Sequence, residues 1–348
     1  MGREHSGLED ATMTVRERSR RAWAGISVRP LLAQPICMSF SARYFDVPFR
    51  RYAEDHRVLA DAQLEVADDF GVDIVSLTSD PCREASDCGA EILWFEDEPP
   101  MPDPDRPRIR DREDLLSLRM PDPLGGGRMH ECVKGVAYLR QQVGNQLPVM
   151  GWIEGPIAEG ADLRGVSTLI EDMLDHPEFV HDLFEFVTEM EVAYAKAQVD
   201  AGADIIGIGD AAASLIGAKM YREFVWPYEK RMVDAVKAMG VAVRLHICGH
   251  IDQLLDGIAE LDIDMLDVDS LTDLRTVREK VRPDLAILGN VDPVRVVQAG
   301  PPEAIRKQLA LCHDIVGPHF IVGAGCEVPA STPHENFRAL VEYAHAAG

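Results

Sequence analysis

The strongest constraint in this sequence is an alternation, from about residue 70 onward, of short runs rich in β-forming residues with longer segments of helical period. Such an alternation is typical of a parallel sheet that its crossover helices cover or close. Seven strands can be placed, an eighth is not located, and 348 residues suit one α/β fold, a (β/α)8 or TIM barrel with extensions. The strand runs cover residues 72–78, 148–155, 203–210, 241–248, 264–270, 285–292 and 319–326.

The segments between these runs carry apolar residues at helical spacing. Within residues 180–190 the apolar positions follow i, i+3, i+4, i+7 and i+10, which places them on one helix face. We expect further helices over residues 221–239, 302–316 and 333–346. Pro227 is expected to kink or split the first of these three.

Two regions depart from the alternation. Residues 1–69 precede it and are expected to form an N-terminal helical extension packed on the barrel, so that residues 70–348 make up the catalytic barrel domain. Residues 95–128 follow the first barrel strand, are crowded with Pro, Asp and Gly, and are expected to hold no regular element. A segment that long in an enzyme is often a lid or a binding loop. A solvent-exposed surface loop without a functional role explains its composition equally well.

Charge and cysteine usage exclude several classes of partner. The net charge is -24, so the surface repels phosphates, and neither nucleic acid nor an anionic membrane is expected as a partner. No run approaches the roughly 20 apolar residues that span a bilayer. The first 25 residues are charged and contain no apolar signal-peptide core, and the seven cysteines are scattered. We therefore expect reduced thiols and a cytoplasmic location.

His246, Cys248 and Cys326 form the most specific candidate site. His246 and Cys248 lie two residues apart at the end of one predicted strand, so their side chains project to the same side. Cys326 ends another strand, and a parallel barrel brings such strand ends together on one face. One histidine and two cysteines are the ligands of a catalytic zinc that keeps its fourth position open. The alternative is that all three are ordinary buried core residues.

Carboxylates follow the other predicted strands. Glu154 is a candidate fourth ligand that leaves when substrate binds, or a substrate contact, unless it only favours a helix N-terminus. Asp210 is placed to hydrogen-bond a metal-bound histidine or the substrate, or else to cap a helix. Asp267 and Asp269 alternate on one strand face as paired functional carboxylates would, unless Asp269 lies in the following loop. His250 lies beyond the strand and is not expected as a ligand.

Five segments resemble the uroporphyrinogen decarboxylase superfamily, and within it the zinc methyltransferases of corrinoid-dependent systems, such as methylcobalamin:coenzyme M methyltransferases and O-demethylating enzymes. The resemblance covers roughly residues 70–345. It implies a (β/α)8 barrel with its active site at the carboxyl ends of the strands. The segments are WIEGPIAEGADLRG (152–165), DAGADIIGIGDAAAS (200–214), LHICGH (245–250), LGNVDP (288–293) and GAGCEVPASTPHENFRAL (323–340).

The zinc ligands distinguish the methyltransferase branch from the decarboxylases, and His246, Cys248 and Cys326 stand at the matching places. Decarboxylases carry a histidine in a Gly-His-Gly setting where this chain has Cys326. Their arginine-rich N-terminal tetrapyrrole motif is not reproduced by SARYFDVPFRR. Asp80, however, falls where decarboxylases keep their catalytic aspartate, so a decarboxylase remains an alternative.

The resemblance therefore implies a zinc-dependent methyltransferase that moves methyl between a small-molecule heteroatom, in a thiol or a methyl ether, and the cobalt of a corrinoid. Zinc would hold a thiol as thiolate, and two cysteine ligands favour a thiol over an ether. The chain has no D-x-H-x-x-G run, so the corrinoid, methylcobalamin, is expected on a partner protein. Related barrels include dimers, so a homodimer is one option. A non-catalytic barrel that binds a tetrapyrrole or a corrinoid protein is a further alternative.

Overall fold

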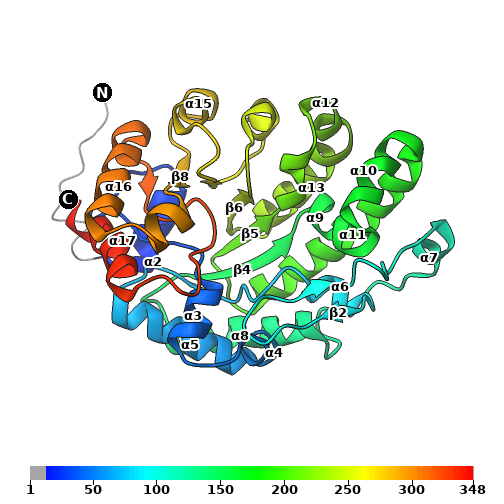
Figure 1. The fold of residues 1–348 in the computed structure, drawn as a ribbon, viewed down its shortest axis with the longest axis horizontal. Coiled ribbons are helices and arrows are strands. Elements are labelled where there is room, and N and C mark those ends of the chain that lie inside the picture. The colour runs from blue at the N-terminus through cyan, green and yellow to red at the C-terminus, as the bar shows by residue number, and fades with distance from the viewer. Residues whose placement is uncertain (1–12, 348) are drawn as a thin grey trace.

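Seven parallel strands form one sheet, in the order β1–β4–β5–β6–β7–β8–β9, in the computed structural model, which describes residues 13–347. Each strand lies within one of the runs that the sequence predicts, and the (β/α)-barrel fold class is confirmed (Figure 1). The first 12 residues of the expected N-terminal extension lie outside the described part. The strands are Val75–Ser76 (β1), Val149–Glu154 (β4), Ile205–Gly209 (β5), Ala242–Ile247 (β6), Met265–Val268 (β7), Ala286–Gly289 (β8) and Phe320–Ile321 (β9).

A short segment from the N-terminal region fills the eighth position of the ring. Ala33 forms a parallel bridge with Val322, just beyond β9. The Gln34 N–H donates to the Val322 carbonyl at 2.9 Å, and the Val322 N–H donates to the Leu32 carbonyl at 2.8 Å. On the other side, the Asp73 N–H donates to the Ala33 carbonyl at 2.8 Å, next to β1. Residues 32–34, which were expected to belong to an N-terminal extension, are therefore part of the barrel.

Helices surround the sheet on its outer side (Figure 1). The expected helix over residues 221–239 is divided, as Pro227 predicts, into a π-helical turn at Tyr221–Val225 and α13. Among residues 13–347, no helix combines the length and apolar composition that crossing a membrane requires. The α-helices are Val15–Trp23 (α2), Met38–Tyr44 (α3), Phe49–Glu54 (α4), His56–Phe70 (α5), Arg83–Asp87 (α6), Arg112–Ser117 (α7), Arg128–Val143 (α8), Pro156–Arg164 (α9), Val166–Asp175 (α10), Pro177–Asp200 (α11), Ala218–Met220 (α12), Trp226–Ala238 (α13), Leu255–Ile258 (α14), Leu274–Lys280 (α15), Pro302–Val316 (α16) and His334–Ala346 (α17).

The segment 95–128 is more ordered than its composition predicts. It contains one strand of the antiparallel pair β2 (Ile92–Leu93) and β3 (Met101–Pro102), as well as α7. The expectation that it holds no regular element is therefore wrong. Asp111 explains part of the difference, because its carboxylate caps α7 by accepting from the N–H groups of Glu113 and Asp114 at 2.9 and 3.0 Å. In Figure 1, α7 lies at the right-hand end of the molecule, away from the strands.

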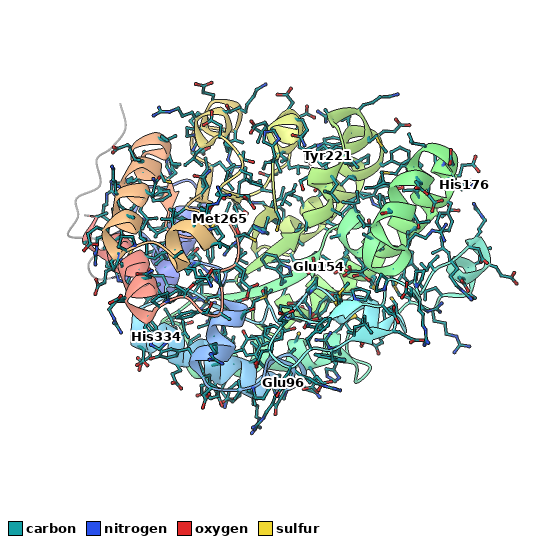
Figure 2. The ribbon with its side chains drawn as sticks, viewed as in Figure 1. Glu96, Glu154, His176, Tyr221, Met265 and His334 are labelled. Atoms are coloured by element: carbon teal, nitrogen blue, oxygen red, sulfur yellow. The ribbon has the colours of Figure 1, made fainter. Side chains whose placement is uncertain are left out.

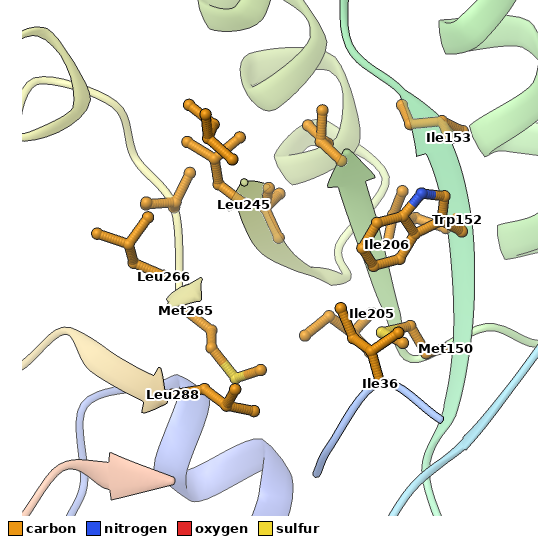
Figure 3. Packing of buried hydrophobic residues seen from close by; sticks show 14 of the residues in the cluster. Ile36, Met150, Trp152, Ile153, Ile205, Ile206, Leu245, Met265, Leu266 and Leu288 are labelled. Atoms are coloured by element: carbon orange, nitrogen blue, oxygen red, sulfur yellow. The ribbon is translucent and has the colours of Figure 1, made fainter. Parts of the chain in front are cut away.

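The interior of the barrel is filled by side chains from alternate strand positions. Figure 3 shows Ile36, Met150 and Met265 converging from different parts of the ring. Trp152 pairs in register with Gly207, where an added Cβ would lie 2.2 Å from the indole ring. Because Gly207 has no side chain, the Trp152 indole can occupy the space beside it, below the carboxyl ends of the strands.

A group of carboxyl side chains is buried between α6, α9 and α11. Glu84, Glu159 and Glu191 are each fully buried, and the Arg83 Nη2 donates to the Glu84 Oε1 at 3.1 Å. Burial, followed by the neighbouring negative charges of Glu84 and Glu154, raises the pKa of Glu191 well above its ordinary value. Burial and mutual repulsion therefore favour the protonated, neutral form of these acids over the ionised form.

We expect Glu191→Gln to stabilise the protein at pH 8 and to leave its stability unchanged at pH 4. A carboxyl whose folded pKa is raised favours the folded state at low pH, and that contribution is lost as pH rises from about 4.3, the unfolded value, through the folded pKa. A neutral amide avoids this loss. Urea unfolding between pH 4 and pH 8 measures the difference, with Glu189→Gln, on the exposed side of α11, as the control. A variant that is less stable than the parent at pH 8 would contradict the assignment.

Candidate metal centre

Four neighbouring strands place one row of residues at the carboxyl end of the barrel. Glu154 on β4 pairs with Gly209 on β5, Gly209 pairs with His246 on β6, and His246 pairs with Asp267 on β7. Cys248 follows the last residue of β6 and, two residues from His246, projects to the same side. Figure 2 shows Glu154 toward the middle of the ribbon, whereas Glu96 and His176 lie at its periphery.

The side chains of His246, Cys248 and Cys326 meet at this end of the barrel. Their possible ligand atoms all lie within 4.8 Å of one another. The His246 Nε2 is 3.1 Å from the Cys248 Sγ and 3.7 Å from the Cys326 Sγ, and the two sulfurs are 3.6 Å apart. Both cysteines are free thiols. The sequence thus predicted correctly that these three residues lie together, although the strands that carry them are about 80 residues apart in the chain.

The electrostatics of the trio favour a thiolate. The hydrogen bond from Cys248, together with His246, lowers the pKa of Cys326 to about 4 in spite of its burial. Burial alone would lower the pKa of His246, but hydrogen bonds with Asp267 and Cys326 raise it to about 10. The site therefore concentrates negative charge on sulfur beside a nitrogen ligand. A divalent cation can replace the protons that hold this arrangement together.

Asp267 faces the other ring nitrogen of His246. Its Oδ2 lies 3.4 Å from the His246 Nδ1 and accepts hydrogen bonds from the Arg244 Nε at 2.8 Å and Nη2 at 2.6 Å. Arg244 is itself fully buried and donates to the Gln34 carbonyl at 3.2 Å. A carboxylate at this position orients an imidazole and leaves its Nε2 free for a metal.

We expect Asp267→Asn to weaken zinc binding by about 10- to 100-fold, because the amide carries no charge to support the imidazole. Competition with a chromophoric chelator measures the zinc dissociation constant. The exposed Asp256→Asn, on α14, is the matched control and should bind zinc as the parent does. An unchanged constant in Asp267→Asn would show that Asp267 does not orient the ligand.

Asp210 has a different place from the one that its position after β5 suggests. Its Oδ1 accepts from the Ala158 N–H in the first turn of α9 at 2.8 Å. Burial, followed by the negative charge of the neighbouring Glu229, raises the pKa of the Asp210 carboxyl group well above its ordinary value. Its backbone N–H donates to the His246 carbonyl on β6 at 2.9 Å. The Asp210 side chain therefore binds an N–H group of α9 and does not cap the 3-10 helix Ala211–Leu215 that follows it. Asp267 rather than Asp210 contacts the histidine ring.

Glu154 is held in the row by two donors. Its Oε1 accepts from the Trp152 Nε1 at 3.1 Å and from the Arg83 Nη2 at 3.4 Å, and burial raises its pKa well above the ordinary value. Gly209 carries no side chain between Glu154 and His246, and an added Cβ there would lie 3.0 Å from the Glu154 Oε2. The carboxyl group thus faces the same end of the barrel as the trio.

Asp80 is a buried partner of an arginine. It accepts from the Arg128 Nη1 at 3.0 Å, from the Cys82 N–H at 3.0 Å and from the Ser79 hydroxyl at 2.7 Å. Burial would raise its pKa, but Arg128 holds it below the usual value. Both carboxylate oxygens are therefore occupied by groups of this chain.

The remaining polar candidates support the turn after Cys248. Asp269 lies beyond β7 and accepts from the Gly249 N–H at 2.9 Å, where Gly249 adopts a φ of 90°. His250 is exposed and contacts Gln253 and Asp252 instead of the trio. Sequence reasoning missed Arg244 and Trp152, and strand alternation was the available signal, because each lies two residues before a site residue on the same face.

Several known proteins are similar to this chain in sequence. The family model described as uroporphyrinogen decarboxylase (URO-D) matches residues 19–347. The chain is 32% identical over 239 residues to the methylcobamide:CoM methyltransferase MtbA of Methanosarcina acetivorans, covering 68% of this chain and 69% of that enzyme. It is 30% identical to a methylated-thiol–coenzyme M methyltransferase of Methanosarcina mazei, covering 82% and 76%. A uroporphyrinogen decarboxylase of Myxococcus xanthus is 28% identical, with 80% of each chain covered.

Solved structures agree on the fold. A methyltransferase from Methanosarcina mazei superposes with a TM-score of 0.87 at 22% sequence identity, covering 95% of this chain and 98% of that one. A B12-independent methionine synthase from Shewanella gives a TM-score of 0.56 at 15% identity, covering 91% and 95%. At these identities the structures support the architecture alone.

Proposed function

This chain belongs to the uroporphyrinogen decarboxylase family, among its corrinoid-linked methyltransferases, and we propose that it is a zinc-dependent enzyme that moves methyl between a thiol and the cobalt of a corrinoid protein. The observation that carries the proposal is the convergence of His246, Cys248 and Cys326 within 4.8 Å. The donor set fits zinc, because one imidazole and two thiolates leave a fourth tetrahedral position for a substrate atom.

Zinc bound there would hold a substrate sulfur as thiolate at neutral pH. The chain's own residues position that site: Asp267 fixes the His246 ring, and Asp269 braces the turn behind Cys248. Two thiolate ligands favour a soft sulfur substrate over the oxygen of a methyl ether. The Methanosarcina relatives include a methylated-thiol–coenzyme M methyltransferase, which supports the same choice.

Glu154 completes the proposed site. Trp152 and Arg83 fix its Oε1, and Gly209 leaves the space between its carboxyl group and His246 free of side chains. We assign Glu154 to a substrate contact, with a departing fourth ligand as the other role that its position permits. Asp210 supports α9 and is not assigned a chemical step.

The corrinoid is proposed to arrive on a partner protein, because the chain contains no D-x-H-x-x-G run of its own. The seven cysteines are all free, which fits the proposed cytoplasmic location. A homodimer remains part of the proposal as one assembly option.

The decarboxylase alternative is less supported. Asp80 stands at the expected place, but Arg128, Ser79 and the Cys82 N–H occupy its carboxylate. A tetrapyrrole would have to displace a buried ion pair in order to use it, at a cost of several kcal/mol.

The test is to incubate the zinc-loaded protein with methylcobalamin and a panel of thiols, methoxyarenes and tetrahydrofolate. We expect methyl transfer to at least one thiol, together with about one zinc per chain. A metal-free protein that transfers methyl at the same rate would contradict the proposal. Corrinoid binding without transfer in any combination would favour the non-catalytic barrel.

A further inference from the structure

Two of the seven cysteines, Cys248 and Cys326, differ from the others in their exposure. Both are partly exposed, whereas the other five are buried, and Cys312, the most exposed of those five, has an exposed fraction of 6%. The Cys248 and Cys326 sulfurs lie 3.6 Å apart at the carboxyl end of the barrel. Oxidation of a cysteine requires access for the oxidant and is easiest for a thiolate. A small oxidant can therefore reach these two sulfurs as a pair.

The backbone holds the two sulfurs near each other, because both cysteine turns contact the same turn, Asp269–Ser270. The Asp269 Oδ2 accepts from the Gly249 N–H at 2.9 Å, directly after the first cysteine. Gly325 directly precedes the second cysteine, and a Cβ added there would lie 2.5 Å from the Ser270 backbone nitrogen. The short distance between the sulfurs is thus fixed by packed backbone on both sides.

The pair can bind a metal or form a disulfide, and each state excludes the other. In a tetrahedral site with Zn–S bonds of about 2.3 Å, two sulfur ligands are about 3.8 Å apart. The separation of 3.6 Å in this protein is close to that value. A disulfide requires about 2.05 Å between the sulfurs and leaves neither of them a thiolate. His246 would then be the one remaining ligand of the trio, so the metal would dissociate.

We propose that a peroxide converts Cys248 and Cys326 into a reversible disulfide, and that this oxidation releases the zinc and stops methyl transfer. The inference rests on the proposed function, because it concerns the regulation of the same site. The two thiolates give one electron each to hydrogen peroxide, whose O–O bond breaks as the S–S bond forms, and two hydroxide ions result. A dithiol that itself becomes a disulfide returns the two electrons, after which zinc can bind again.

The neighbouring sulfur favours a disulfide over higher oxidation of one cysteine. Peroxide first converts one thiolate to a sulfenic acid with release of hydroxide. A second thiolate within reach then displaces the other hydroxide and completes the disulfide before a second peroxide arrives. The partner sulfur is 3.6 Å away in this pair, whereas the Cys312 sulfur contacts the Asn290 Oδ1. The arrangement therefore favours the reversible product.

The test treats the reduced, zinc-loaded protein with hydrogen peroxide, alkylates the remaining thiols and digests the chain with trypsin. We expect peptide 245–275, which contains Cys248, to be joined to peptide 308–338, which contains Cys326. About one zinc per chain should be released, and transfer from free methylcobalamin should fall at least about 10-fold in parallel. A phosphine reductant followed by zinc should restore both the bound metal and the activity.

Cys312→Ser is the matched control, because peptide 308–338 also contains Cys312. This variant should form the same joined peptides as the parent does, which assigns the link to Cys326. Cys248→Ser should form no link between the two peptides. Mass analysis of the undigested protein should show a single chain about 2 Da lighter than the reduced form.

The proposal would be overturned if zinc stayed bound in a molar excess of peroxide. It would also be overturned if zinc left with sulfinic acids and no joined peptides, or if Cys326 paired with Cys37 or with a second copy of the chain. A reduced protein that binds no zinc, or that transfers no methyl when zinc is bound, would instead contradict the proposed function. The joined peptides can still be sought in that protein, so the two failures are distinguishable.

Discussion

Replacing Cys326 by serine is expected to remove the bound zinc and to lower methyl transfer about 1,000-fold, equivalent to about 4 kcal/mol of activation free energy. Cys326 supplies one of two sulfurs and lies 3.6 Å from Cys248 and 3.7 Å from the His246 Nε2. A hydroxyl is a much weaker zinc ligand than a thiolate, and two remaining ligands do not hold the ion against dilution. Metal analysis after gel filtration and an assay with free methylcobalamin measure both effects.

The control for this prediction is Cys312→Ser. Cys312 is a buried free thiol whose sulfur contacts the Asn290 Oδ1, 3.6 Å away, instead of the trio. It should retain about one zinc per chain and its activity. If Cys326→Ser kept both its zinc and its activity, Cys326 would not be a ligand and the proposed site would be wrong.

Arg244→Met is expected to lower the free energy of unfolding by about 3 to 5 kcal/mol. Arg244 is fully buried inside the barrel, and its guanidinium donates to the Asp267 Oδ2 at 2.8 and 2.6 Å. Removing the arginine leaves the Asp267 carboxylate buried beside His246 without its main partner. Urea unfolding of the zinc-free protein measures the loss.

The double variant Arg244→Met/Asp267→Asn separates the charge effect from simple loss of packing. With the carboxylate gone, most of the stability should return, because no uncompensated charge remains in the barrel. Zinc affinity should stay low, because the His246 ring still lacks its carboxylate. A single variant that loses less than about 1 kcal/mol would contradict the importance assigned to the buried pair.

Much of the site followed from strand alternation. His246 and Cys248 are two residues apart at the end of β6, so their side chains share one side. The carboxyl ends of parallel strands lie on one face of a barrel, and the sequence therefore predicts that Cys326 lies near them. The seven strand runs were predictable for a similar reason, because buried parallel strands read as short apolar runs between amphipathic helices.

Other parts could not be predicted because they depend on tertiary contacts. Residues 32–34 join the ring through a single bridge and a few hydrogen bonds, with no run of β-forming residues to mark them. The short β2–β3 pair and α7 lie within a composition typical of loops. Asp210 and Asp267 both follow the right pattern for supporting His246. Only the register and the buried Arg244 select Asp267.

The most direct test of the account is zinc X-ray absorption of the purified protein, with and without a thiol substrate. Without substrate we expect two sulfur ligands at about 2.3 Å and at least one nitrogen at about 2.0 Å. Addition of a thiol that accepts methyl should increase the sulfur count to three. A protein that binds no zinc, or a spectrum with only nitrogen and oxygen ligands, would contradict the central claim that His246, Cys248 and Cys326 hold the catalytic metal.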